Sequence, residues 1–148
     1  MNEAKRRIGN LATGASFGFL GVEFLRLRSR TCKWRAYEPP LLKKRTVLLR
    51  KLKAVYRGDQ SQPIERVIYL ITPIVWGWVR DFAVGDASRC FGFIKDWVEK
   101  KVRRHLMRAR KRRGFGLKRW SRRWLDEELG LVNDYRIQRP RRKALPAR

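Results

Sequence analysis

The spacing of hydrophobic and polar residues changes at Pro39-Pro40. Before the two prolines, residues 15–27 are rich in Phe, Leu and Val, and a second short run, residues 34–39, follows a cationic turn. Such runs, separated by turn residues, are typical of β-strands, because aromatic and branched side chains pack well on a pleated surface. We therefore expect an N-terminal β-hairpin that ends at the prolines.

After the prolines, hydrophobic residues recur every three or four positions. Leu48, Leu52 and Val55 share one side of a helix over residues 41–57, and cations occupy another side. This pattern predicts an amphipathic helix with a basic outer face. The cations of that face include Lys43, Lys44 and Lys51.

A second helix, over residues 63–84, is nearly all apolar and is expected to lie in the centre of the fold. Pro63 suits its first turn. Pro73 lies inside the helix and should kink or split it, because proline has no N–H for the helical hydrogen bond. Core packing is the expected role of its aromatic residues, Trp76, Trp78 and Phe82.

A third, long helix is predicted over residues 87–113, with Asp86 as its N-cap and Gly114 and Gly116 at its end. Apolar residues from Phe91 to Ala109 keep helical spacing along one face. The cations that this spacing places away from the apolar face include Arg103, Arg104, Arg108, Arg110 and Lys111.

The C-terminal part begins with a short helix over residues 121–131, for which Ser121 is the expected cap and Gly130 the stop. The tail, residues 139–148, is basic and contains prolines, so we expect it to be mobile until bound. The sequence therefore predicts an α+β protein, mainly α. An N-terminal β-hairpin precedes a three-helix bundle, and a short basic helical segment with a mobile tail ends the chain.

The charge of the chain indicates its kind of partner. The 148 residues contain 38 Lys and Arg against 13 Asp and Glu, a formal net charge of +25. A compact domain with this charge repels itself, and a polyanion that neutralises it is stabilising. The longest apolar stretch, residues 67–79, is too short to span a bilayer, and we see no secretory signal. We expect a cytoplasmic protein without a membrane partner; a cationic membrane-surface protein is the alternative that charge alone allows.

The segment GFGLKRWSRRW, residues 114–124, combines four cations with two tryptophans. Lysine and arginine neutralise phosphates, and flat aromatic rings stack on unpaired bases, so this composition favours RNA loops and single strands. Trp120 and Trp124 are four residues apart and share a face if the segment is helical. Two alternatives stay open for this pair: the rings stack on bases, or they pack in the core and only the flanking cations contact RNA.

Residues suited to catalysis or metal binding are sparse. The single histidine, His105, lies beside cations in the third helix and is expected to face the surface or the RNA. The acids at 126–128 spread over different helix faces and are expected to pair with Arg122 and Arg123. The two cysteines are far apart and are expected to be reduced thiols. We therefore expect no enzyme activity, no metal and no cofactor.

The expected RNA-binding residues form three sets. The first surrounds the two tryptophans, the second lies toward the end of the third helix, and the third is the outer face of the first helix. In that order they are Lys118, Arg119, Trp120, Arg122, Arg123 and Trp124; Arg103, Arg104, Arg110, Lys111, Arg112 and Arg113; and Lys43, Lys44 and Lys51.

Three segments, in this order, resemble the C-terminal part of the reverse transcriptase/maturase proteins encoded in bacterial group II introns. NEAKRRI, which contains Lys5, and the following SFGFLGVEF are similar to the last palm motifs of that family. Residues 72–98, TPIVWGWVRDFAVGDASRCFGFIKDWV, resemble its thumb segment and depart from it at Thr72, Trp76 and Asp81. Residues 111–137, KRRGFGLKRWSRRWLDEELGLVNDYRI, resemble its C-terminal signature, and KALPAR follows at the end.

The resemblance implies a division of the chain into three parts. Residues 1–40 correspond to a remnant of the palm, residues 41–138 to the maturase-specific or thumb domain, and residues 139–148 to a flexible basic tail. Such a domain binds group II intron RNA and assists its splicing by stabilising the folded RNA, and a DNA target is a further partner that the family allows. The matching positions extend from Lys118 through Arg136, which adds Arg136 to the expected RNA-binding residues.

The polymerase centre of this family is a Tyr-Ala-Asp-Asp turn that holds two metal ions, and this sequence has no adjacent pair of aspartates. Together with the single histidine, this implies a maturase domain without a catalytic centre of its own. One alternative is a fragment of a split or degenerate reverse transcriptase that needs a separately encoded finger-palm chain for polymerase activity. Another is a relic with general affinity for nucleic acids.

Overall fold

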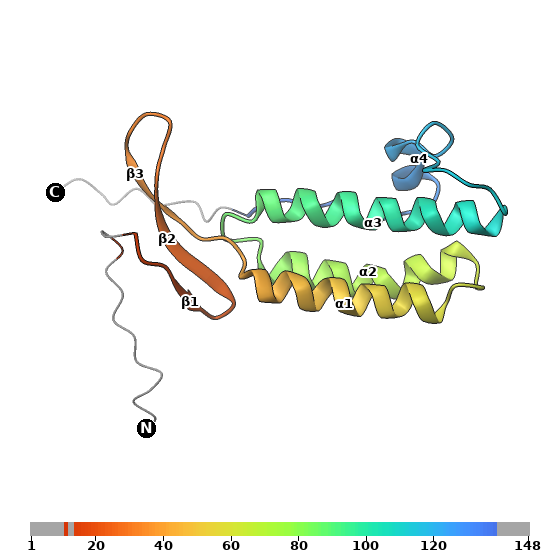
Figure 1. Ribbon diagram of the computed structural model, residues 1–148, viewed down its shortest axis with the longest axis horizontal. Helices are drawn as coiled ribbons and strands as arrows, with labels where there is room; N and C mark the ends of the chain where they lie inside the picture. The colour runs from red at the N-terminus through yellow and green to blue at the C-terminus, as the bar shows by residue number, and fades with distance from the viewer. Residues whose placement is uncertain (1–10, 12–13, 139–148) are drawn as a thin grey trace, which may run out of the picture.

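A three-stranded antiparallel sheet stands at one end of three long helices in the computed structural model, which describes residue 11 and residues 14–138 (Figure 1). The NEAKRRI motif and the predicted mobile tail, residues 139–148, lie outside the described residues. The elements are β1 (Phe17–Phe19), β2 (Val22–Arg28), β3 (Trp34–Tyr37), α1 (Leu42–Gly58), α2 (Ile64–Asp81), α3 (Ser88–Ala109) and α4 (Arg122–Glu127). This mainly helical α+β architecture confirms the predicted fold class.

The sheet has one strand more than the predicted hairpin. Residues 15–27, expected as one strand, are interrupted by a turn at Leu20 and Gly21, whose φ angles are +49° and +87°. Two-residue turns with positive φ at both positions match the twist of paired strands, so β1 folds back on β2 with Phe17 opposite Phe24. A hydrophobic pattern does not mark such a turn when an apolar residue such as Leu20 occupies it.

The sheet is joined to the helices mainly by hydrogen bonds of the main chain. The Leu41 N–H donates to the Gly21 carbonyl oxygen at 2.8 Å, and the Asp86 N–H donates to the Glu38 carbonyl oxygen at 3.0 Å. The Asp86 carboxylate in turn accepts from the Glu38 N–H at 3.2 Å. The prediction that Asp86 caps α3 is therefore wrong: the N-cap is Ala87, without a side-chain hydrogen bond. The partner of Asp86 lies 48 residues away in the chain, beyond the reach of a local pattern.

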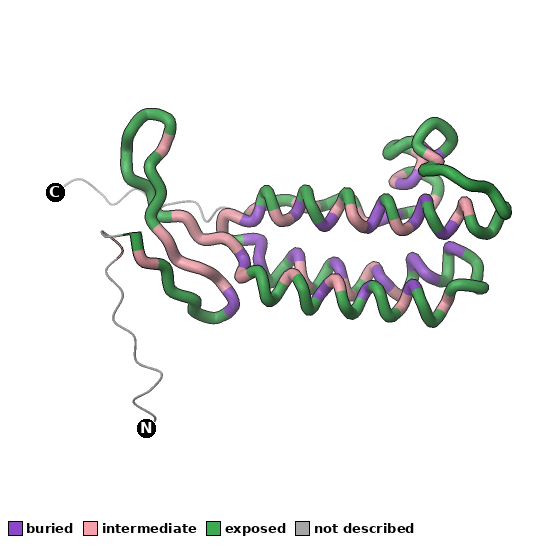
Figure 2. The backbone as a smooth tube through the Cα atoms, in the orientation of Figure 1, coloured by how far each residue is buried: buried purple, intermediate pink, exposed green. Residues whose placement is uncertain are grey.

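The hydrophobic core lies between α1, α2 and α3, where the buried positions follow the inner sides of the helices (Figure 2). The predicted spacing of α1 is confirmed, because Leu48 and Leu52 are buried and Val55 packs against the core. The buried residues that the three helices contribute include Leu48, Leu52 and Tyr56 from α1; Val67, Ile71, Val75 and Val79 from α2; and Phe91, Ile94, Val98 and Val102 from α3.

Helix α2 runs through Pro73 as one element, so the predicted split is wrong. Pro73 lies on the exposed side of the helix. Because proline has no N–H, the carbonyl oxygen of Tyr69, four residues earlier, receives no helical hydrogen bond from it. Tyr69 is 79% exposed. Water can hydrogen-bond to that oxygen, which reduces the cost of the proline. Trp76 is exposed on the same side, with the Arg80 guanidinium 5.1 Å from its ring centroid, so the core role expected for Trp76 is also wrong.

The last described residues, 129–138, form an extended strap that returns along the helices toward the sheet (Figure 1). Leu131 is buried, the Tyr135 ring centroid lies 6.2 Å from that of Phe91, and the Gln138 N–H donates to the Ala83 carbonyl oxygen at 2.8 Å. Burial, with a smaller effect of the nearby Glu99, raises the pKa of the Tyr135 hydroxyl. The strap therefore completes the cover of the core.

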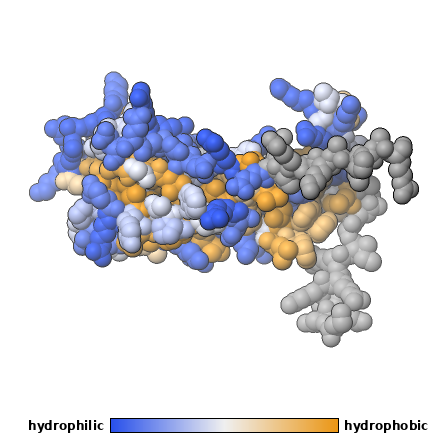
Figure 3. Space-filling view, turned by 180° about the vertical axis from the view of Figure 1, so that it is seen from behind, coloured by the Kyte–Doolittle hydropathy of each residue, from blue (hydrophilic) through white to orange (hydrophobic). Residues whose placement is uncertain are grey.

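Hydrophobic residues also gather on the surface of the helical part when the molecule is seen from behind, and hydrophilic side chains border them (Figure 3). Several large side chains of the sheet are exposed as well, among them Phe19, Leu20 and Trp34. The molecule therefore exposes apolar side chains as well as cationic ones.

Replacement of Pro73 by alanine should stabilise the protein. Alanine restores the hydrogen bond to the Tyr69 carbonyl oxygen on an exposed helix side, and we expect the free energy of unfolding to rise by about 1–3 kcal/mol. Urea unfolding of the two proteins measures this difference. Gly77→Ala, on the same exposed side with open space around the new methyl group, should add only about 0.5–1 kcal/mol. A loss of stability in Pro73→Ala would mean that the proline ring makes contacts the fold needs.

Candidate nucleic-acid interface

A buried carboxylate organises the C-terminal half of the structure. Glu99 of α3 is 1% exposed, and its Oε2 atom accepts from Arg103 Nη2 at 3.1 Å and from Arg122 Nε at 3.0 Å. Arg122 also donates through Nη2 to Asp96 Oδ1 at 2.7 Å. Hydrogen bonds and ion pairing with Glu99 raise the pKa of Arg122. The network fixes the start of α4 to the middle of α3.

Arg103 extends this network into the loop that follows α3. The guanidinium of Arg103 is buried, and its Nε atom donates to the Trp120 carbonyl oxygen at 2.9 Å. The expectation that Arg103 lies on the outer, RNA-facing surface is therefore wrong. Its charge is used inside the protein, since a buried guanidinium needs both a carboxylate and further hydrogen bonds.

The loop itself, residues 110–119, is the basic loop of the structure: six of its ten residues are Lys or Arg. Helix α3 ends at Ala109 instead of 113, because the chain turns at Lys111, which has a φ of +51°, and the Lys111 N–H donates back to the Arg108 carbonyl oxygen at 2.8 Å. Gly116 has a φ of +66° and lies against Trp120, where an added Cβ would be 2.5 Å from the ring. The loop is thus anchored at both ends.

The rings of both tryptophans pack against the core. Trp120 is buried, and the guanidinium groups of Arg110 and Arg119 lie 5.3 and 6.0 Å from its ring centroid. Trp124 is half-buried against the core. They do not share a helix face, because α4 begins only at Arg122, after Ser121, whose side chain caps it as predicted by accepting from the Trp124 N–H at 3.2 Å.

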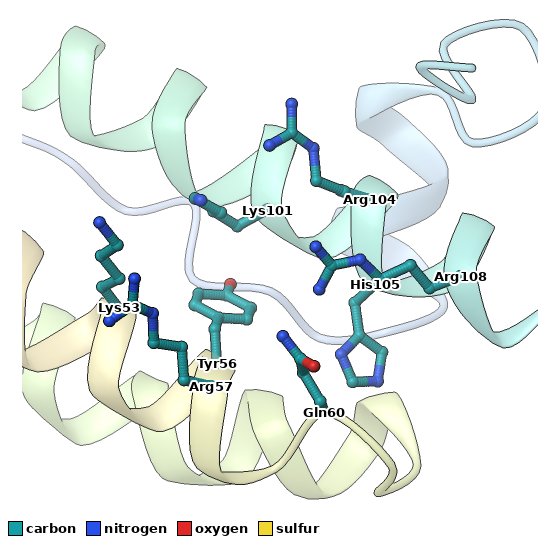
Figure 4. A pocket seen from close by; sticks show the side chains of 8 residues that line it. All are labelled: Lys53, Tyr56, Arg57, Gln60, Lys101, Arg104, His105 and Arg108. Carbon is teal, nitrogen blue, oxygen red and sulfur yellow. The ribbon is translucent and has the colours of Figure 1, made fainter. Parts of the chain in front are cut away.

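A basic cleft opens between α1 and α3 (Figure 4). Lys53 and Arg57 reach into it from α1, and Lys101, Arg104 and Arg108 line it from α3. The cavity has a volume of about 190 Å³, and none of the residues that line it in the described part of the chain is acidic. Five positive charges without a neutralising carboxylate make a site that favours an anion.

His105 and Tyr56 also line this cleft. His105 is buried, and its Nε2 atom lies 2.9 Å from the Gln62 carbonyl oxygen, to which it donates. The expectation that His105 lies on the helix surface is therefore wrong, because it fastens α3 to the α1–α2 connection. Burial raises the pKa of the Tyr56 hydroxyl far above its ordinary value, so this residue stays neutral.

The neighbouring charges of the cleft act on Lys101. Burial lowers the pKa of Lys101, and the neighbouring Arg104 and Lys53 lower it further. The Lys101 ammonium also lies 5.1 Å from the centroid of the Trp97 ring. Bound phosphate oxygens would relieve the repulsion among these charges.

A second cavity, of about 300 Å³, lies on the other side of Arg104. Lys100, Arg103 and Arg104 of α3 line it together with Gly114, Phe115 and Leu117 of the basic loop. Phe115 and Leu117 are 74% and 62% exposed. We call this cavity the Phe115 pocket. It shares Arg104 with the basic cleft, so the two sites form one continuous surface.

The structure separates the other predicted residues into groups. Arg123 is exposed and pairs with Glu127 at 2.8 Å, as expected for the acids at 126–128, whereas Arg122 pairs with Asp96 and Glu99 instead. Arg136 is exposed and lies 3.3 Å from Asp134. The exposed cations of the basic loop are Arg110, Lys111, Arg112, Arg113, Lys118 and Arg119; those on the outer side of α1 are Lys43, Lys44 and Lys51.

Four residues of the basic cleft, Lys53, Arg57, Lys101 and Arg108, were not among the predicted RNA-binding residues. A signal for them exists in the helical spacing. Lys53 and Arg57 are four residues apart and border the buried Tyr56, and Lys101 and Arg108 border the buried His105 in the same way. Cations that border the buried faces of two packed helices lie opposite each other. The sequence alone does not show which helices pack together, so this signal could not be used without the structure.

Within residue 11 and residues 14–138, no group of three or more His, Cys, Asp and Glu side chains could hold a metal ion. Of the helices in the described part of the chain, none is both long enough and apolar enough to cross a bilayer.

Comparison with known families gives one match. The family model of the group II intron, maturase-specific domain matches residues 45–124. Comparisons with curated proteins and with solved structures gave no match. The matched residues include both sides of the basic cleft, the basic loop and the start of α4.

Replacement of Glu99 by glutamine should destabilise the protein by about 3–5 kcal/mol, because Arg103 then keeps a buried charge without a carboxylate. Urea unfolding measures the loss. Glu128→Gln removes the same charge from an exposed position and should change stability by less than about 0.5 kcal/mol. Equal effects of the two substitutions would show that Glu99 acts only through the net charge.

Anion binding in the basic cleft should weaken at alkaline pH. The lowered pKa of free Lys101 rises when phosphates bind, so binding takes up a proton, and affinity falls as pH rises from the lowered pKa toward the ordinary lysine value of about 10.4. Binding of inorganic polyphosphate between pH 7 and about 10 tests this. Arginine stays charged over this pH range, so Lys101→Arg should lose the part of the fall in affinity that comes from residue 101. Lys53 is present in both proteins, so the difference between their pH profiles reports Lys101 alone. Parallel pH profiles of the two proteins would contradict the assignment.

Proposed function

The chain belongs to the group II intron maturase-specific domain family, and we propose that it binds group II intron RNA and assists splicing by stabilising the folded RNA. The observation that carries this proposal is the basic cleft. Its five cations come from two helices and face a cavity that no acidic residue of the described chain lines. In this role the RNA carries out the chemistry and the protein holds its fold, so no catalytic centre in the chain is required.

Phosphates are the RNA groups that suit the cleft. Arginine and lysine bind phosphate oxygens by charge and by several hydrogen bonds at once, and each neutralised phosphate releases counterions. Structured RNA presents closely spaced phosphates along its grooves, and proteins recognise it largely through them. The basic loop adds six exposed cations on the other side of Arg104, which extends the contact along the RNA.

Further partners belong to the same proposal. A DNA target presents the same phosphates and could bind the same surface, and the cytoplasm is the proposed site of action. A separately encoded finger-palm chain is a proposed protein partner, supported by the exposed Phe19, Leu20 and Trp34 of the sheet. Co-purification with a chain that carries an Asp-Asp centre would support this partner, and a stable monomer beside such a chain would contradict it.

Removal of cleft cations should weaken RNA binding and its salt dependence together. For the triple variant Arg57→Ala, Lys101→Ala and Arg108→Ala, the slope of log affinity against log salt should become shallower by about two to three, since each phosphate contact contributes roughly 0.7–0.9. Filter binding to intron RNA at several salt concentrations measures the slope. The matched control replaces Arg28, Arg30 and Arg35, three cations at the far end of the sheet, and should leave the slope nearly unchanged.

Specificity separates a maturase role from general affinity for nucleic acids. At physiological salt the protein should bind folded intron RNA more tightly than an unrelated RNA duplex of equal length. Equal affinity for both RNAs would sink the proposed splicing role, even if the cleft variant behaves as expected.

A further inference from the structure

The Phe115 pocket combines features that phosphate binding does not use. Phe115 and Leu117 expose most of their side chains, although each lies between charged or glycine residues in the most cationic segment of the described chain. Single exposed apolar residues are common on protein surfaces, but here two of them line one cavity of about 300 Å³. That volume is at the lower end of the roughly 300–1,000 Å³ range of small-ligand sites.

The backbone holds the pocket in place before any ligand binds. Lys111, Gly114 and Gly116 have positive φ angles of +51°, +126° and +66°, and the Arg112 N–H donates to the Met107 carbonyl oxygen at 3.0 Å. The Trp120 N–H donates to the Gly116 carbonyl oxygen at 2.9 Å, and the buried Trp120 is fixed by Arg103. Because the loop is already ordered, Phe115 loses little conformational freedom on binding.

The surroundings of the pocket decide which ligand suits it. Lys100, Arg103 and Arg104 line its wall; Arg103 is paired with Glu99 inside the protein, and Arg104 also lines the basic cleft. An apolar protein partner would have to cover these cations and remove their water without neutralising them, which is costly. A nucleotide supplies both a flat aromatic face and a phosphate, so it satisfies the ring and the cations together.

We propose that the Phe115 pocket receives a single unpaired base of the bound RNA. The base stacks on Phe115 beside Leu117, and the phosphate next to it binds Arg104 at the border of the basic cleft. This inference rests on the proposed function and deepens it: the protein recognises a bulged or looped nucleotide flanked by paired RNA, and a continuous duplex lacks the group that fills the pocket.

A fluorescent adenine analogue, 2-aminopurine, tests the proposal with the full chain. One RNA hairpin carries it as a single bulged nucleotide, and a second hairpin carries it paired in the same stem. The wild-type protein should bind the bulged hairpin more tightly and quench its fluorescence, since stacking on an aromatic ring quenches the analogue. Phe115→Ala should lose about 5- to 150-fold in affinity for the bulged hairpin only, the size expected for one stacked base.

Two further variants separate stacking from structure. Phe115→Tyr keeps an aromatic face and should keep both the preference and the quenching. Tyr69→Ala removes an aromatic residue of similar exposure, 79%, from α2, and should change neither. Since Phe115 is exposed, Phe115→Ala should unfold at the same urea concentration as the wild type.

Other outcomes overturn the inference in distinguishable ways. Equal loss on both hairpins would make Phe115 a support of the loop and not a stacking platform. Unchanged binding of both hairpins by Phe115→Ala would leave an apolar protein partner as the occupant of the pocket. Failure of the wild-type protein to bind either hairpin or folded intron RNA would instead remove the proposed function, on which the inference depends.

Discussion

The buried carboxylate of Glu99 is the interaction on which the C-terminal half of the molecule depends. In a chain with 38 cations and 13 acids, most acidic residues could be expected to remain in water, yet this one is almost fully covered and holds two guanidinium groups. Through Arg103 it positions the Trp120 carbonyl oxygen, and through Arg122 it positions α4. A buried ion pair contributes little to stability compared with apolar packing, but it is favourable only when the charged groups are well aligned and fully hydrogen-bonded. That geometry gives the basic loop a defined shape.

Helix α3 connects this internal network with the external surface. One of its sides carries Glu99 and Arg103 toward the loop and α4, and another carries Lys101 and Arg108 into the cleft opposite α1. Arg104 lies between the two and belongs to both cavities. A shift of α3 would therefore change the cleft, the pocket and the ion network together. This arrangement makes the surface a single unit instead of a set of separate charges, which suits the recognition of one shaped RNA.

Much of the fold follows from the sequence, because helical spacing is a local property. The core positions of α1 and the cap at Ser121 were predictable for that reason. The cleft was not, since Arg57 and Lys101 are far apart in the chain and meet only through packing. Arg103 misled the prediction in a different way: a charged residue beside a buried stripe is normally outside, and only its partners, Glu99 and the Trp120 carbonyl oxygen, show why it is inside. The resemblance to intron maturases identified the family, but the residues that form the cleft came from the geometry.

The uncompensated cleft makes ionic strength act on this molecule in two opposite directions. Added salt screens the repulsion among the clustered cations, so the free protein should become more stable as salt increases. The same salt competes with phosphates for those cations and weakens RNA binding. At low salt the free fold is under its greatest internal repulsion, and the proposed RNA should bind most tightly. Bound RNA would then stabilise the folded state by mass action. If the chain binds RNA as proposed, RNA and counterions are alternative stabilisers of one charge distribution, and the folded protein would rely most on RNA in the medium where counterions are scarcest.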